Sequence, residues 1–151
     1  MAEETLRTKI QTNMVATMRA QDKPRLGVIR LIQAGIKQRE VDERITLTDE
    51  QILDLLDKMV RQRRDSIKQF EAAKRDDLVQ QEVYEITVIQ DFLPEQLSSA
   101  EIETLVQNAI KEVGAQSIKD MGKVMALVKP AVQGRADIGE VGNLIKSSLA
   151  S

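Results

Sequence analysis

The stretch LPEQLSSAE, residues 93–101, divides the chain into two helical parts. Pro94 has no backbone N–H and disfavours helical geometry in the residue before it, so the preceding helix ends there. Ser98 followed three residues later by Glu101 is a capping box, the pattern in which a helix begins. We therefore expect an N-terminal domain over residues 1–93 and a C-terminal domain over residues 97–151.

Upstream of this boundary, apolar residues recur at helical spacing, and no stretch shows the alternation of a strand. Four helices are predicted from this pattern. The first has Leu6, Ile10, Met14 and Met18 on one face and stops before Lys23. The second starts at Pro24 and fades over residues 39–44. The third starts at the capping box Thr48–Gln51 and ends in a turn over residues 71–76, and the fourth reaches Phe92.

Downstream, three start signals predict three short helices that form a bundle. The first helix follows Ser98 and ends at Gly114, because glycine readily adopts the left-handed terminating conformation. Ser117 with Asp120 starts the second, and Asp137 with Glu140 starts the third. The fold class predicted for the whole chain is therefore all-α.

Composition excludes several classes of site. The 151 residues include no cysteine and no histidine, so disulfides, cysteine or histidine metal ligands and histidine bases are absent. We expect no metal, no cofactor and no catalytic residue. No apolar run spans a bilayer and the N-terminus lacks a secretory pattern, so we expect a cytoplasmic protein with no membrane partner. The net charge of -2 supplies no general attraction to nucleic acid.

One charged residue falls on an apolar stripe. Arg63 lies in the middle of the face formed by Ile52, Leu56 and Met59, and Glu82 lies within the apolar arc of the next helix. A buried charge needs a partner, so we expect an ion pair between Arg63 and either Glu82 or Glu85. The alternative is that one of these carboxylates acts as an acid or base in a cleft.

The same helix carries an exposed basic strip. Arg61, Arg64 and Lys68 are three and four residues apart, which places them on one side of the helix. Such a strip can contact a phosphate backbone. Nearby acidic residues favour the plainer interpretation of a solvated, ion-paired face.

Two C-terminal segments combine glycines with cations. We expect Gly122 to allow a close helix contact, Gly134 to end a helix and Asp137 to cap the next one. Four cations remain without a structural role, and we expect them to gather near one turn beside a helix N-terminus, where they would hold a phosphate. These cations are Lys119, Lys123, Lys129 and Arg135.

Taken in order, these segments resemble the stand-alone GatB/YqeY family over nearly the whole chain. The resemblance rests on Arg30 and on RQRRDS (61–66), RDDL (75–78), EVYE (82–85), FLPEQL (92–97), DMGKVM (120–125) and GRAD (134–137). One departure is Ile138-Gly139, where the family pattern has a glycine directly after the aspartate.

The resemblance implies a helical N-terminal domain followed by a three-helix C-terminal domain similar to the tail of the B subunit of glutamine-dependent Asp/Glu-tRNA amidotransferases. In that enzyme the tail is implied to engage tRNA, while a separate domain carries the chemistry. The family is associated with carbon–nitrogen ligase activity with glutamine as amido-N-donor. By this analogy we expect the chain to keep the tRNA-facing module without the domain that would activate a carboxylate.

Three functions stay open at this point. The first is a tRNA-associated accessory module in translation, with the seven cations named above as contacts. The second is a protein-interaction module for an amidotransferase or another translation component, for which Met14, Met18 and Met59 would line an adaptable groove unless they are core. The third is a free-standing amide-forming enzyme, for which no ATP-site motif is present. The sequence does not indicate an oligomeric state.

Overall fold

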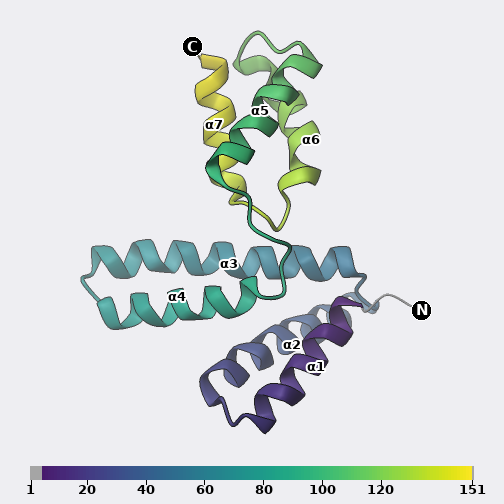
Figure 1. Ribbon diagram of the computed structural model, residues 1–151, viewed down its shortest axis with the longest axis vertical. Coiled ribbons are helices and arrows are strands. Elements are labelled where there is room, and N and C mark those ends of the chain that lie inside the picture. Colours follow the sequence, from purple (N-terminus) through teal and green to yellow (C-terminus); the bar gives the residue numbers. More distant parts are fainter. Residues whose placement is uncertain (1–4, 151) are drawn as a thin grey trace. The chain divides into compact units, whose positions relative to one another are not determined.

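The computed structural model describes residues 5–150, and all regular structure in that range is helical (Figure 1). The predicted all-α class is confirmed. The helices are α1 (Leu6–Arg19), α2 (Lys23–Glu43), α3 (Asp49–Ala72), α4 (Asp76–Gln90), α5 (Ser99–Val113), the short 3₁₀ helix η1 (Ile118–Asp120), α6 (Met121–Val132) and α7 (Ile138–Ala150). The chain divides into two compact units, Met1–Pro94 and Glu95–Ser151.

Local signals start α2 and α3 close to where they were predicted. The Thr48 side chain accepts from the Gln51 backbone N–H, and the Gln51 side chain accepts from the Thr48 N–H, which completes the predicted capping box. Asp22 accepts from the Arg25 N–H at 3.2 Å at the start of α2. The α3–α4 turn passes through Lys74 in the left-handed region, within the predicted segment.

The core of the first unit is aliphatic and joins all four helices. Its fully buried members include Ile10 from α1, Ile32 from α2, Leu56 from α3 and Ile89 from α4. The long helices α3 and α4 lie side by side along their length, while α1 and α2 form a second hairpin beside them (Figure 1). Met14 and Met59 pack against this core, so they form no open groove.

The predicted place of Met18 on the buried face of α1 is wrong, whereas the end of α2 lies in the predicted range. Met18 is 48% exposed, whereas Thr17 is buried. A spacing of four residues advances 400° around a helix, so a row of such steps drifts by about 40° each time and leaves the buried face by Met18. The helix α2 ends at Glu43, inside the charged stretch 39–44 where its end was expected, and Arg39 pairs there with Glu43 at 2.6 Å one turn apart.

The second unit packs three helices around a core of valines and isoleucine. Val106, Val124, Val141 and Ile145 are fully buried within it. Gly114 ends α5 with φ 71°, as predicted.

The capping bonds and glycines of this unit differ from the predictions in two places. Ser117 makes no side-chain capping bond; instead η1 precedes α6, and Asp120 accepts from the Gln116 N–H at 3.0 Å. A carboxylate used to fix the preceding turn is not free to complete a capping box. A Cβ placed on Gly122 would meet nothing within 4 Å, so the expected close contact is absent there. A Cβ placed on Gly142 would lie 3.5 Å from the Met125 methyl group, which is an ordinary van der Waals distance.

Candidate functional site

The basic strip on α3 is partly neutralised by its own helix. Arg61 is exposed, and its Nε lies 3.6 Å from an Asp57 carboxylate oxygen one turn earlier. Asp57 is only 8% exposed, and the positive charge of Arg61 offsets part of the cost of burying its carboxylate. Arg64 is half-buried and Lys68 is exposed. Lys68 is thus the member of the strip that is most accessible to an anion.

Arg63 joins α3 to α4. Its Nε donates to Glu85 at 3.0 Å, and its Nη1 donates to the Met59 carbonyl at 3.1 Å. The side chains of Arg63 and Glu85 are 15% and 13% exposed. Glu85 is therefore the partner chosen from the two considered, and the pair fixes how two long helices meet.

Glu82 lies about one turn before Glu85 on α4, and the pKa of its carboxyl is raised. Burial raises its pKa, the negative charge of Glu85 raises it further, and Arg63 acts in the opposite direction. This environment suits a carboxyl that releases its proton late. Within residues 5–150, no group of three or more acidic side chains is arranged to hold a metal ion.

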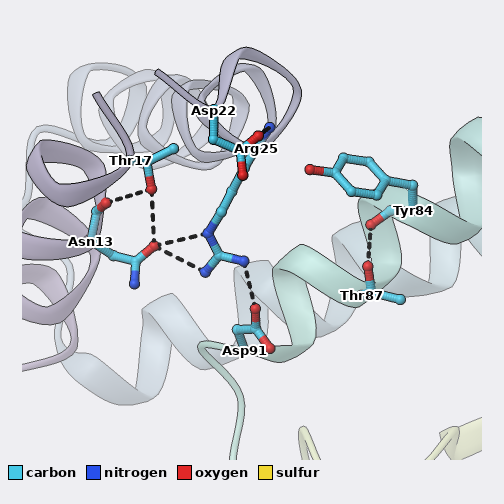
Figure 2. Close-up of polar contacts among 7 residues, drawn as sticks. All are labelled: Asn13, Thr17, Asp22, Arg25, Tyr84, Thr87 and Asp91. Atoms are coloured by element: carbon cyan, nitrogen blue, oxygen red, sulfur yellow. Dashed lines mark hydrogen bonds and ion pairs between the residues drawn. The ribbon is translucent and has the colours of Figure 1, made fainter. Parts of the chain in front are cut away.

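A polar network that the sequence reasoning missed centres on Arg25 (Figure 2). Its Nε and Nη2 donate to Asn13 Oδ1 at 3.2 and 2.9 Å, and its Nη1 donates to Asp91 at 2.7 Å. Thr17 Oγ1 donates to the Asn13 carbonyl at 2.7 Å. One guanidinium thereby ties α1 and α2 to the end of α4. The capping pattern around Asp22 marks the start of this helix, but no local signal marks a partner 66 residues away.

Tyr84 stands next to this network. Burial raises the pKa of its hydroxyl, and the negative charge of Asp22 adds to that effect, while Arg25 opposes it. In Figure 2 the hydroxyl is directed toward the side where Asp22 and Arg25 lie. The Tyr84 backbone carbonyl accepts from Thr87 Oγ1 at 2.6 Å.

A cavity of about 470 Å³ lies between α1 and α2 and includes Arg7, Gln33 and Lys37 in its wall. Glu40 crosses its end, where it forms an ion pair with Arg7 and accepts from the Leu47 N–H at 2.8 Å. The backbone hydrogen bond from Leu47 lowers the pKa of Glu40, and Arg7 lowers it further. These contacts anchor the loop after α2.

The four C-terminal cations do not gather as predicted. Lys119 and Lys123 lie at the start of α6, whereas Lys129 and Arg135 lie at and beyond its last turn. Lys123 and Lys129 are six residues apart, which separates them by about 9 Å along the axis and places them on different sides of the helix. The prediction treated nearness in sequence as nearness in space, and an intervening helix prevents that.

Arg135 is engaged in the fold of its own unit. Its Nε donates to the Glu95 carbonyl at 3.0 Å, and its carbonyl accepts from the Leu97 N–H at 2.8 Å. The Gln96 side chain donates to the Gly134 carbonyl at 2.9 Å. Gly134 has φ 73°, a conformation that favours glycine. Residues 95–97 and 134–135, which these hydrogen bonds join, are called the strap of the second unit.

Lys119 in η1 and Lys123 in α6 are both exposed and lie four residues apart, across the junction of the two helices. The structure shows no ion pair to either side chain within residues 5–150. Asp120 lies nearby: the Gln116 N–H is the largest cause that lowers its pKa, and Lys123 contributes a smaller part. The start of α6 is therefore a small surface with two available cations and one occupied carboxylate.

Residues 5–150 contain no helix with both the length and the apolar character needed to cross a bilayer.

Comparison with known proteins gives one family over almost the whole chain. The sequence model of the family described as Yqey-like protein matches residues 7–149. A relative from Pyrenophora tritici-repentis, named altered inheritance of mitochondria protein 41, mitochondrial, is 31% identical over 136 residues, which cover 89% of this chain and 75% of the relative.

Proteins of the same name show similar identity over a shorter stretch. The one from Lachancea thermotolerans is 36% identical over 107 residues, covering 69% of this chain and 57% of the relative. The one from Candida glabrata is 38% identical over 108 residues, covering 69% of this chain and 59% of the relative. The chain thus spans somewhat more than half the length of these two relatives.

Proposed function

Because the chain belongs to the Yqey-like protein family, we propose that it is a tRNA-associated accessory module that contacts the phosphate backbone and carries no catalytic site of its own. The basis is the resemblance of its C-terminal unit to the tail of the tRNA-dependent amidotransferase B subunit. The proposal concerns recognition of charge and shape, since aromatic residues for base stacking make up only 2% of the sequence.

The observation that carries this proposal is the pair Lys119 and Lys123 at the start of α6. Two exposed ammonium groups lie four residues apart at the junction of η1 and α6, where they are available to phosphates, and the positive end of the α6 dipole adds to their field. Lys129 and Lys68 are further exposed cations on other surfaces. Arg61, Arg64 and Arg135 contribute less, because each is engaged within its own unit or half-buried.

The test is fluorescence anisotropy of labelled bulk tRNA titrated with the whole chain, between about 50 and about 200 mM salt. Each phosphate that a cation neutralises should contribute about 0.7–0.9 to the slope of log affinity against log salt. We expect Lys119→Glu/Lys123→Glu to weaken binding at low salt and to reduce the slope by about two.

The control is Lys9→Glu, an exposed site on α1 outside the candidate surface, compared with the single Lys123→Glu variant of equal charge change. The control should bind nearly as well as the wild-type chain. Equal losses in both variants would reduce the effect to overall charge, and binding that is absent or insensitive to salt would contradict the proposal.

The proposal treats the glutamine-dependent ligase activity associated with the family as a property of larger proteins. Purified chain given ATP, glutamine and tRNA should show no glutamine-dependent ATP turnover above the background of a buffer control. Turnover that follows the protein through purification would contradict this part. The relatives are named as mitochondrial, and translation takes place both there and in the cytoplasm, so the proposal holds for either compartment.

A further inference from the structure

The helix α2 has a second apolar face that points away from the core. Its buried residues Val28, Ile29, Ile32 and Ile36 lie on one side. On the opposite side Leu31 is 48% exposed and Val41 is 64% exposed. These two large aliphatic side chains are ten residues apart on the outward side of the helix.

These exposed residues follow the pattern of a helix-pairing seam. From Gly27 the spacings alternate between four and three residues, as at the a and d positions of a coiled coil. The members are Gly27, Leu31, Ala34, Gln38 and Val41. All five are exposed, and a Cβ placed on Gly27 would meet nothing within 4 Å. The seam is about 21 Å long, with small residues where a second helix would come closest.

A row of cations runs along one edge of this seam. Lys23, Arg30 and Lys37 are seven residues apart, so they lie in a line at intervals of about 10.5 Å. Each of them directly precedes an a position, as Arg30 precedes Leu31 and Lys37 precedes Gln38. This is the g position of the heptad, where coiled coils place charges that determine the partner. All three are exposed, and none has an ion pair within the described part of the chain.

The other edge has a different character. Gln38 donates to both carboxylate oxygens of Asp42, at 3.1 and 3.0 Å. The carboxylate is therefore held on its own helix. The seam thus has one basic edge and one edge that is locally satisfied, which gives a docking helix a preferred side.

We propose that the outer face of α2 docks an amphipathic helix of a partner protein whose apolar stripe is flanked by Asp or Glu residues. Charge complementarity selects this occupant. An antiparallel second copy is disfavoured, because that pairing would place Lys23, Arg30 and Lys37 against the same cations. A parallel second copy would offer them only Asp42, which Gln38 already binds. A nucleic acid is disfavoured, because phosphates would leave Leu31 and Val41 uncovered. This inference does not rest on the proposed tRNA contact at α6.

The probe is a designed 28-residue helical peptide with Leu at a, Ala at d and Glu at e and g, labelled for anisotropy. Its Glu rows repel one another, which keeps it from pairing with itself. A second peptide has Lys in place of every Glu. We expect the whole chain to bind the Glu peptide, less tightly as salt rises, and to leave the Lys peptide unbound.

Two variants locate the binding. Leu31→Glu/Val41→Glu should abolish it, and circular dichroism should show unchanged helicity because both side chains are exposed. Arg30→Glu/Lys37→Glu should weaken binding of the Glu peptide by about tenfold or more and should create binding of the Lys peptide. Lys9→Glu/Lys58→Glu, an equal charge change on α1 and α3, should bind the Glu peptide like the wild-type chain.

Four results would overturn the inference. They are no binding of the Glu peptide to the wild-type chain, equal binding of both peptides, binding that survives Leu31→Glu/Val41→Glu, and self-association in sedimentation experiments that this variant removes. If Arg30→Glu/Lys37→Glu lost tRNA binding but still bound the Glu peptide like the wild-type chain, the basic edge would be a nucleic-acid surface instead. Loss of tRNA binding in the α6 variant alone concerns only the proposed function.

Discussion

In the first unit, ion pairs between two side chains link the helices, whereas in the second unit main-chain carbonyls accept the hydrogen bonds that link residues 95–97 to residues 134–135. Arg25 joins α2 to Asp91 at the end of α4, and Arg63 joins α3 to Glu85. In the second unit, three hydrogen bonds join residues 95–97 to Gly134 and Arg135; main-chain carbonyls accept all three, and the side chains of Gln96 and Arg135 donate two of them. The first unit therefore depends on paired charges, and the second also depends on a chain path that Gly134 permits.

This difference has a consequence for how each unit tolerates change. A partly buried ion pair leaves an uncompensated charge when one partner is lost, so a single substitution has a large effect. A backbone hydrogen bond survives most substitutions and fails when the backbone conformation itself becomes costly. The following tests compare the two kinds of linkage, from the largest expected effect to the smallest.

Ile32→Ala should lower the free energy of unfolding of the first unit by about 3 kcal/mol, because Ile32 is fully buried and the cavity would remain. Ile145→Ala should do the same in the second unit. Amide hydrogen exchange followed residue by residue would report each unit. Loss of protection confined to the substituted unit is expected, and loss in both units would show that they unfold as one.

Arg63→Met should cost about 2 kcal/mol, because it leaves the Glu85 carboxylate largely buried without its cation. The double variant Arg63→Met/Glu85→Met should recover most of that loss. Urea unfolding of the four members of this cycle measures the coupling energy. Additive effects of the two substitutions would mean that the pair does not link α3 to α4.

Gly134→Ala should destabilise the second unit by about 1 kcal/mol, since φ 73° is unfavourable for any residue with a Cβ. Gly122→Ala is the matched control, because it lies within α6 in open space, and should stabilise by about 0.5–1 kcal/mol. Thermal unfolding would show the two midpoints moving in opposite directions. A shift in the same direction would argue against the role assigned to the strap.

Glu82→Gln should have the smallest effect, which depends on pH. A carboxyl whose pKa is raised by folding stabilises the folded chain below its unfolded pKa and loses that contribution as the pH rises through the folded pKa. At neutral pH the charged Glu82 is therefore a small cost that glutamine removes. Urea midpoints should be higher for the variant at pH 7 and should converge near pH 4. A variant that is less stable at pH 7 would indicate that the attraction to Arg63 is the larger effect.

Features that depend on neighbouring residues could be predicted from the sequence. Capping at Thr48 and Ser98, the left-handed end at Gly114 and the turn around Lys74 depend on hydrogen bonds and dihedral angles within a few residues. The all-α class follows from the spacing of the apolar residues. A buried arginine on α3 could also be anticipated, because its position on the apolar stripe demands a partner.

Features that depend on packing could not. The choice of Glu85 over Glu82, the contact between Arg25 and Asp91, and the separation of Lys123 from Lys129 depend on how helices meet and how far each one extends. The second apolar face of α2 is visible in the spacing of its residues, but spacing alone does not tell which of two faces is buried. Only the assembled helices leave Leu31 and Val41 in solvent, since a helix buries the side that finds an apolar neighbour.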